Sequence, residues 1–205
     1  MIAIVDYDMG NLRSVQKALL HVGADAQIVT RPEQIARAEK IVFPGQGAFK
    51  DAIARLRDHG LAEPVLEAFR AGKPFLGICL GLQLLFESSC EDGQHEGLGL
   101  LEGDVRKFEF NNDNGRKLSV PQIGWNAITW DRHSELMRGI EQGSYVYFCH
   151  SYYVAPTDAS VTLLQAEYGH PYTAGIEKDN LFAVQFHPEK SQAVGLKMLE
   201  NFVRL

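Results

Sequence analysis

Cys79 stands between two glycines, Gly77 and Gly81, where one short apolar run meets another. The run over residues 74–78 has the length of a buried strand, and residues 80–86 are typical of a short helix. A sharp strand-to-helix turn crowds its neighbours, and glycine relieves that crowding. The thiol at such a turn projects over the first turn of the helix, where free N–H groups favour a thiolate. The spacing therefore favours a cysteine nucleophile, with a buried packing cysteine as the alternative.

A thiol nucleophile needs a base, and the base needs a group that orients it. Among the seven histidines, His187 is best placed, because it directly follows the apolar run 181–186. Glu189 lies two residues further on, and in extended backbone such side chains point the same way. A histidine that merely ends a strand beside a solvated carboxylate would explain the pair in isolation. Together with the cysteine motif, Cys79, His187 and Glu189 predict a catalytic triad.

A glycine-rich turn follows another apolar run and contains Gly45, Gln46 and Gly47. Its glycines would let backbone N–H groups approach a developing oxyanion, and the N–H of Leu80 would be a second donor. A plain strand-to-helix turn is the alternative for these residues. The stretch lacks the third glycine of a dinucleotide-binding fingerprint, and the chain contains no Walker pattern.

The sequence predicts no metal site and no cofactor. His187 and Glu189 form a His-x-Glu pattern, but the downstream Pro-Cys-x-x-Cys of zinc deaminases is missing. The three cysteines are Cys79, Cys90 and Cys149, which include no Cys-x-x-Cys pair and suggest no disulfide framework.

Strands and helices alternate in the half of the chain that contains the cysteine. Short apolar runs predict strands over residues 2–5, 26–29, 41–43 and 74–78. Helical spacing predicts helices over residues 12–22, 49–56 and 65–69, and another that begins at Pro32. This alternation predicts an α/β fold with a doubly wound, mostly parallel central sheet and flanking helices, with ligands at the carboxyl ends of the strands.

The second half of the chain is strand-rich. Residues 88–103 are rich in Gly, Glu and Ser and predict a surface loop. Further strands are predicted over residues 105–110, 127–130, 145–154, 161–166, 173–176 and 181–186, before a last helix over 194–202. No linker, repeat or low-complexity tract divides the chain, so we expect residues 1–205 to form a single domain.

The composition is that of an ordinary globular protein, with 45% hydrophobic and 22% charged residues. The net charge of −6 and the scattered basic residues argue against binding to nucleic acid or an anionic membrane. The N-terminus lacks the basic region and long apolar core of a signal peptide, and no run approaches eighteen apolar residues. We therefore expect a cytoplasmic protein.

With Cys79, His187 and Glu189 in this order, the chain resembles the class I glutamine amidotransferases. Over essentially its whole length it is most similar to the members that serve imidazole glycerol phosphate synthase in histidine biosynthesis. The motifs that carry this likeness lie at residues 77–83, 97–100, 121–126, 150–152 and 187–191. Amidotransferase subunits of anthranilate or aminodeoxychorismate synthase usually carry Gly-His-Gln where this chain has Gly-Leu-Gln at residues 81–83. A non-catalytic binding module with the same fold is a further alternative, disfavoured by the intact triad.

The resemblance implies a glutaminase that hydrolyses glutamine to glutamate and ammonia through a cysteinyl thioester. Cys79 would attack the side-chain amide, His187 would transfer protons and Glu189 would orient His187. The oxyanion would be held by N–H groups of Leu80 and of the turn at Gln46 and Gly47. Many family members carry an aliphatic residue in place of Gln46. Because the donor to the oxyanion is a backbone N–H, we expect the same chemistry with glutamine at this position. The implied substrate-binding residues are Gly45, Gln83, Glu91, Ser151 and Tyr152.

The resemblance also implies a partner. Ammonia would pass through a tunnel into a separate (β/α)8-barrel cyclase subunit, which makes imidazole glycerol phosphate and aminoimidazole carboxamide ribotide. The two chains would form a heterodimer, with Asn11, Trp125 and Lys190 in the contact surface. We expect weak glutaminase activity from the isolated chain, because a free hydrolase would waste glutamine.

Overall fold

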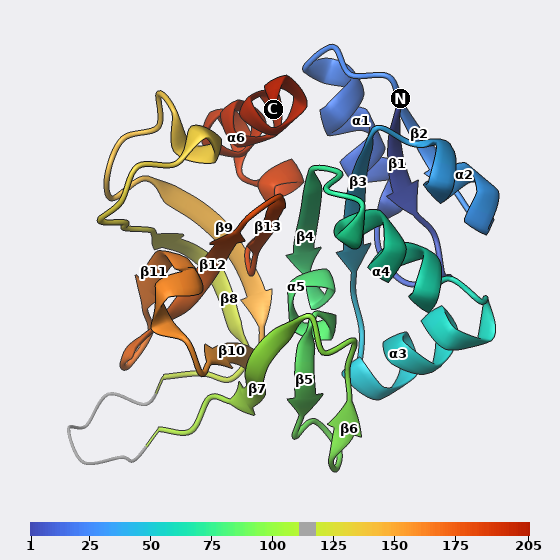
Figure 1. Cartoon of the computed structure of the whole chain (residues 1–205). Helices are drawn as coiled ribbons and strands as arrows, with labels where there is room; N and C mark the ends of the chain where they lie inside the picture. Colours follow the sequence, from blue (N-terminus) through green and yellow to red (C-terminus); the bar gives the residue numbers. More distant parts are fainter. Residues whose placement is uncertain (111–117) are drawn as a thin grey trace.

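The computed structural model describes residues 1–110 and 118–205 (Figure 1). Its central sheet begins with parallel strands from both halves of the chain. Their order in the sheet is β2 (Ala26–Val29), β1 (Ile2–Val5), β3 (Lys40–Gly45), β4 (Phe75–Cys79) and β13 (Leu181–Val184). The neighbours β3 and β13 both pair in parallel with β4, so the carboxyl ends of all three strands meet at one edge of the sheet.

The second half of the chain extends this sheet beyond β13. The added strands follow in the order β12 (Pro171–Lys178), β10 (Tyr152–Pro156), β7 (Leu101–Lys107), β5 (Phe86–Ser89) and β6 (His95–Glu96), while β11 (Thr162–Glu167) pairs with β12. Strands β8 (Gln122–Ala127) and β9 (Tyr145–His150) form a separate antiparallel pair. The predicted α/β fold with a mostly parallel central sheet and flanking helices is confirmed, and the antiparallel strands belong to its strand-rich second half.

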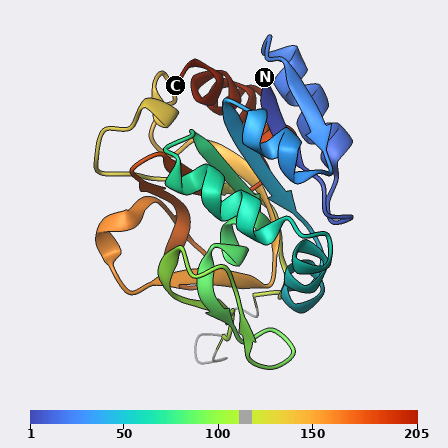
Figure 2. The same cartoon turned by 45° about the vertical axis from the view of Figure 1, so that its right-hand side comes forward.

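Helices cover both faces of the parallel strands. Successive side chains of a strand point to opposite faces, so Ile2 and Ile4 enter one core while Ala3 and Val5 enter the other. The first core contains side chains of α1 (Leu12–His21) and α6 (Gln192–Arg204). The second contains side chains of α2 (Pro32–Arg37), α3 (Phe49–Asp58) and α4 (Ala62–Arg70). Figure 2 shows α4 lying across the second face, so the parallel strands are buried on both sides.

One predicted strand is two strands in the structure. The run over residues 145–154 divides at Ser151 into β9 and β10, which belong to different sheets. The Nδ1 atom of His150 lies 2.8 Å from the carbonyl oxygen of Tyr152, and this local bond closes the turn between the two strands. Aromatic and apolar residues on both sides of His150 and Ser151 hid the break, because strands on either side of a sharp turn have the same pattern.

The predicted strand at residues 127–130 is also displaced. Its place is taken by β8 over Gln122–Ala127, and Thr129 makes only an isolated bridge to Gln165. Pro121 and Gly124 bracket the start of β8, and in a sequence both residues favour a turn over a strand.

The prediction of a surface loop over residues 88–103 was wrong in part. The end of β5, all of β6 and the start of β7 lie in this stretch, and residues 90–94 and 97–100 connect them. Helix α5 (Leu80–Leu84) ends early, because the N–H of Leu98 donates to Leu84 and the N–H groups of Leu100 and Leu101 donate to Leu85. The segment that resembled a loop therefore satisfies the last carbonyl groups of the helix that follows the cysteine.

Close packing of α5 against β3 gives a first test. A Cβ atom on Gly81 would lie 1.9 Å from the carbonyl oxygen of Phe43. We expect Gly81→Ala to lower the free energy of unfolding by about 3 kcal/mol, despite a helix preference for alanine of about 1 kcal/mol. Urea denaturation measures this change.

Gly60→Ala is the matched control. Gly60 has a φ of +66° and open space where a Cβ would lie. Its replacement carries only the cost of a left-handed residue, about 1 kcal/mol. Equal losses in the two variants would contradict the close approach at Gly81.

Candidate active site

Cys79 is the last residue of β4 and has a φ of +57° and a ψ of −111°. A positive φ is strained for a residue with a side chain and persists only where the surroundings enforce it. A Cβ on Gly77 would lie 3.0 Å from the Cβ of Ala183, and one on Gly81 would strike Phe43. Both flanking glycines are therefore needed for the turn to pack between its neighbouring strands.

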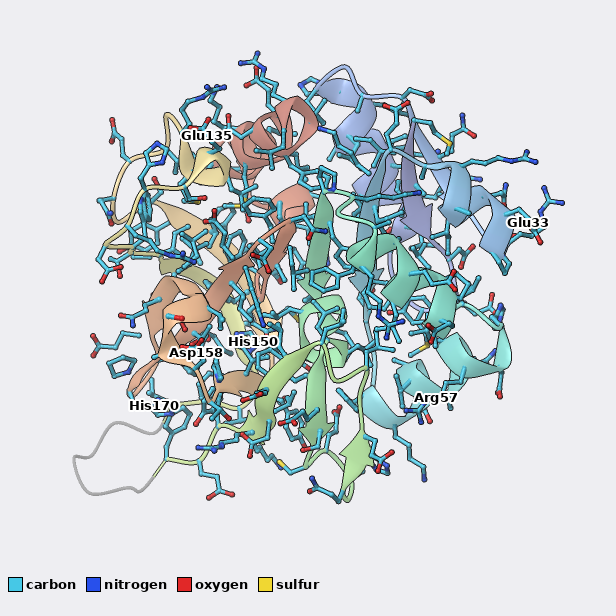
Figure 3. All side chains as sticks on the ribbon, in the orientation of Figure 1. Glu33, Arg57, Glu135, His150, Asp158 and His170 are labelled. Atoms are coloured by element: carbon cyan, nitrogen blue, oxygen red, sulfur yellow. The ribbon has the colours of Figure 1, made fainter. Side chains whose placement is uncertain are left out.

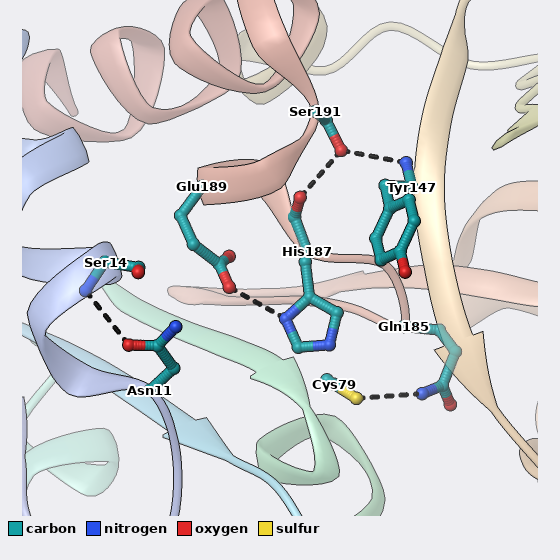
Figure 4. A network of polar contacts seen from close by, with 8 residues as sticks. All are labelled: Asn11, Ser14, Cys79, Tyr147, Gln185, His187, Glu189 and Ser191. Atoms are coloured by element: carbon teal, nitrogen blue, oxygen red, sulfur yellow. Dashed lines mark hydrogen bonds and ion pairs between the residues drawn. The ribbon is translucent and has the colours of Figure 1, made fainter. Parts of the chain in front are cut away.

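His187 and Glu189 follow β13, the neighbour of the cysteine strand. Nδ1 of His187 lies 2.8 Å from Oε1 of Glu189, and the two side chains are 4% and 1% exposed. Figure 4 shows the imidazole between the Glu189 carboxylate and the Cys79 sulfur. The structure thus brings together the three residues that the sequence predicted as a triad.

The charge state of His187 depends on these two neighbours. Burial favours the neutral ring, but hydrogen bonding and attraction to Cys79 and Glu189 outweigh it and raise the pKa of His187 to about 10. His187 is therefore an imidazolium at neutral pH, with its charge balanced by the carboxylate on one side. Such a cation beside a thiol favours the thiolate.

A ring of three hydrogen bonds fixes the backbone of His187, and Figure 4 shows the two that Ser191 makes. The hydroxyl of Ser191 donates to the carbonyl oxygen of His187 at 2.7 Å and accepts from the N–H of Tyr147 at 3.0 Å. The N–H of His187 in turn donates to the carbonyl oxygen of Tyr147 at 3.0 Å. From the sequence, Ser191 and Tyr147 were assigned no role. The one feature that could have indicated this support of His187 is the serine directly after the His-Pro-Glu-Lys stretch.

A cavity of about 470 Å³ opens over Cys79. Its lining comes from the turn after β3, the end of β4, and α5, β9 and β10, at the edge where β3, β4 and β13 end. Its lining residues are Gln46, Gly47, Cys79, Leu80, Gln83, Glu91, Pro121, Cys149, His150, Ser151, Tyr152, His187 and Lys190. The predicted oxyanion residues line the cavity, as do all predicted substrate-binding residues except Gly45.

Gly45 lies beneath the cavity wall. It is buried and is the register partner of Cys79 across β3 and β4. The hydroxyl of Tyr7 donates to the carbonyl oxygen of Pro44 at 2.8 Å, and a Cβ on Gly45 would lie 2.4 Å from that hydroxyl. The structure therefore gives Gly45 a packing position, in which its missing side chain lets Tyr7 brace the glycine-rich turn.

Gln83 and Glu91 both make hydrogen bonds within the protein. Nε2 of Gln83 donates to the carbonyl oxygen of Tyr152 at 3.0 Å and to Oε1 of Gln185 at 3.1 Å. Oε2 of Glu91 accepts from the N–H of Phe49 at 2.7 Å, at the start of α3. Burial raises the pKa of Glu91 above its ordinary value, although the bond from Phe49 opposes this. Both side chains are thus held in place at the cavity wall.

His150 is a buried histidine. From the sequence it belongs to the motif at residues 150–152, but no function was predicted for its side chain. In Figure 3 it lies toward the middle of the molecule, whereas Glu33 and Arg57 lie at the periphery. Burial lowers the pKa of His150 to about 4, so the ring is neutral. The carbonyl of Tyr152 can only accept, so Nδ1 of His150 carries the proton in their bond.

The residues predicted to contact a partner lie around the cavity mouth and beside it. Lys190 lines the cavity, and its Nζ lies 5.9 Å from the ring centroid of Tyr147. Trp125 is 45% exposed, and its ring centroid lies 6.1 Å from that of Tyr147. Asn11 is exposed and caps α1, and this helix contacts the 3-10 helix Pro188–Lys190.

In residues 1–110 and 118–205, no group of three or more His, Cys, Asp or Glu side chains is arranged to hold a metal ion. Among the same residues, no helix combines the length and apolar character needed to cross a membrane.

The ion pair between His187 and Glu189 gives a second test. We expect Glu189→Gln to lower the pKa of His187 from about 10, because the variant loses a negative charge and keeps the shape. NMR titration of the His187 ring measures this. A raised pKa adds stability that is fully present below about pH 6.5 and is lost as the pH rises through about 10. The stability advantage of the unaltered chain over the variant should shrink over that interval.

Glu135→Gln is the control for this titration. Glu135 lies 3.6 Å from His133 in an exposed pair (Glu135 is labelled in Figure 3). Its replacement should leave the titration of His187 unchanged. An unchanged titration in Glu189→Gln as well would contradict the ion pair.

Comparisons with known proteins identify the family of the chain. The family model described as glutamine amidotransferase class-I matches residues 3–205. An imidazole glycerol phosphate synthase subunit HisH from Syntrophotalea carbinolica is 50% identical over 203 residues, which cover 98% of each chain. The subunit HisH from Aquifex aeolicus is 48% identical over 202 residues, or 98% of this chain and 95% of its own.

Solved structures are similar in fold at lower sequence identity. The structure of PurLQS from Thermotoga maritima matches with a TM-score of 0.74 and 21% identity, over 99% of this chain and 97% of that one. The glutaminase domain of CTPS from Trypanosoma brucei, with bound acivicin, matches with a TM-score of 0.67 and 16% identity, over 99% and 93% of the two chains. The chain therefore belongs to the class-I glutamine amidotransferase family, and within it to the group of HisH subunits of imidazole glycerol phosphate synthase.

Proposed function

We propose that the chain hydrolyses L-glutamine to glutamate and ammonia at Cys79, as the glutaminase subunit of an imidazole glycerol phosphate synthase in histidine biosynthesis. The observation that carries this proposal is the buried line from Glu189 through His187 to Cys79 at the floor of a cavity. Relatives that share about half of the sequence over nearly the whole chain carry the name of that subunit.

The first half of the reaction forms a thioester. The thiolate of Cys79 attacks the side-chain carbonyl carbon of glutamine, and the amide oxygen becomes an oxyanion. The N–H of Leu80, at the start of α5, has no partner within that helix and is a proposed donor to the oxyanion, with the turn at Gln46 and Gly47. As the C–N bond breaks, the His187 imidazolium protonates the nitrogen, and ammonia leaves.

The second half hydrolyses the thioester. Acylation removes the charge on sulfur, which is one cause of the raised pKa of His187, so neutral His187 becomes more favourable at this stage. The ring accepts a proton from an attacking water, the C–S bond breaks, and glutamate leaves. Cys79 returns to the thiolate and His187 to the imidazolium, so one water is consumed for each ammonia released.

The cavity wall supplies groups for the rest of the substrate. Backbone groups of Ser151 and Tyr152 are proposed to bind glutamine, beside the fixed amide of Gln83. Glu91 is proposed to meet the substrate ammonium, and its bond from Phe49 supports this by holding the carboxylate at the wall. Gly45 is proposed to support substrate binding as well, and its packing against Tyr7 supports this by holding the glycine-rich turn beside Cys79.

A cyclase subunit on a separate chain is the proposed consumer of the ammonia. We propose that this subunit is a (β/α)8 barrel and that it docks over Asn11, Trp125 and Lys190. An exposed apolar surface beside the cavity supports this position, since such surfaces mark interaction sites. Its exposed large apolar side chains are Val120, Ile123, Trp125 and Tyr145.

The chain is further proposed to act as one cytoplasmic domain over residues 1–205. The insertion of β13 between β4 and β12 supports a single domain, because the last strand of the chain completes the sheet formed by its first half.

Replacing the nucleophile tests the catalytic assignment. We expect Cys79→Ala to lower glutamine hydrolysis by roughly 10³-fold or more, because no other group forms the thioester. Glutamate release is measured with and without the cyclase chain of an imidazole glycerol phosphate synthase, supplied together with its nucleotide ligand. Co-elution of the variant with the cyclase on size-exclusion chromatography confirms that the variant complex assembles, and turnover with ammonium salt shows that the cyclase in it is active.

The outcomes of this assay separate the alternatives. Strong stimulation by the cyclase, lost in Cys79→Ala, supports the triad and the partner together. Hydrolysis that is indifferent to the cyclase would keep the triad but assign the chain to another synthase. A variant that still used glutamine normally would overturn the role of Cys79.

A second variant tests the docking surface. We expect Trp125→Ala to weaken binding to the cyclase by about tenfold or more, as loss of a central aromatic contact does. Isothermal titration calorimetry measures the affinity. Leu205→Ala is the control, because Leu205 is also exposed, at 40%, but lies at the C-terminus. Equal affinities for both variants would move the interface away from Trp125.

A further inference from the structure

Gln185 is a polar residue inside an apolar run, and the reaction described above gives it no part. It follows β13 directly, two residues before His187, and its side chain is 0% exposed. A buried amide must find partners for its hydrogen-bonding groups. The partners of Gln185 are Gln83 on one side and the sulfur of Cys79 on the other.

The neighbouring groups determine which way the amide of Gln185 faces. The carbonyl oxygen of Tyr152 can only accept, so Gln83 presents its Nε2 to that oxygen at 3.0 Å. The same Nε2 lies 3.1 Å from Oε1 of Gln185, so the oxygen of Gln185 is the acceptor in this bond. Nε2 of Gln185 is therefore the atom that faces Cys79, with 3.7 Å between nitrogen and sulfur (Figure 4).

This bond acts on the charged form of the cysteine. A thiolate accepts a hydrogen bond more strongly than a thiol, and a hydrogen bond to the charged form of a group favours that form. The contact is buried, where water competes little with it. Figure 4 shows His187 on one side of the sulfur and Gln185 on another, so the two donors come from different directions.

We propose that Gln185 is a further positioning residue of the active site, whose amide N–H holds the Cys79 sulfur in place and stabilises its thiolate. This rests on the proposed role of Cys79 as nucleophile. The amide also links the sulfur to the substrate wall, because Gln83 joins Gln185 to the backbone of Tyr152. Gln185 thereby fixes the distance between the attacking atom and the surface that binds glutamine.

The test uses Gln185→Met, which keeps the length of the side chain and removes the donor. The rate of iodoacetamide alkylation at Cys79 is measured against pH in the full chain. Mass spectrometry of the Cys79 peptide separates this site from the exposed Cys90 and Cys149. We expect the alkylation profile to move to higher pH by about one unit, with a rate near pH 7 lower by roughly tenfold.

Gln122→Met is the matched control. Gln122 is also buried, at 2% exposed, but its amide oxygen accepts from the hydroxyl of Tyr172 and it makes no bond to the sulfur. The control is expected to lose stability and to keep the alkylation profile of the unaltered chain. An equal shift in both variants would show a general effect of a lost buried amide and would overturn the proposal.

Gln185→Glu is the second variant, in case Gln185→Met does not fold. It has nearly the same shape as glutamine and places a negative charge beside the sulfur, so the profile should move further to higher pH. Either variant, once shown by thermal unfolding to be folded, overturns the proposal if its alkylation profile matches that of the unaltered chain.

Glutamine kinetics in the complex with the cyclase provide a separate readout. A residue that acts on the sulfur should lower kcat and leave KM nearly unchanged. A raised KM with unchanged kcat would place the effect at the substrate wall and overturn the role at the sulfur. Alkylation needs no glutamine turnover, so the role of Gln185 can fail or hold independently of the proposed glutaminase function.

Discussion

Cys79 has a backbone conformation that residues with side chains rarely adopt, and the packing on both sides of it maintains that conformation. Strand β4 arrives between β3 and β13, and α5 leaves in contact with the backbone of β3 at Gly81. No side chain larger than hydrogen fits at that contact. The position of the sulfur therefore follows from the closeness of a helix and a strand, before any polar group is considered.

The order of strands in the sheet explains why residues far apart in the sequence meet at Cys79. Parallel strands end at a common edge, and β3, β4 and β13 are adjacent. The glycine-rich turn, the cysteine and the stretch that begins with His187 are found where these three strands end. The strand-rich second half then closes the site, because β9 and β10 diverge at Ser151 and wall the cavity.

The parts of the site that could be predicted from sequence were those that depend on local geometry. The glycines around Cys79 reflect a tight turn, and His187 and Glu189 stand two apart in extended backbone, so their spacing alone indicated their arrangement. The fold followed from alternating apolar runs. The partners of Gln83, the packing of Gly45 against Tyr7 and the break at Ser151 depend on contacts between distant segments, which leave no periodic trace in the chain. Roles of individual residues in catalysis and docking stay predictions.

Tyr147 has two structural roles, one for its backbone and one for its side chain. Its peptide group holds the backbone of His187 through Ser191, and any amino acid except proline supplies that N–H and carbonyl. Its side chain faces Trp125 and Lys190 instead. Substitutions at this position can therefore change the outer surface of β9 while the backbone of His187 keeps its place. The outer face of β9 can thus change without disturbing the buried side chains of Val146, Phe148 and His150 on its inner face.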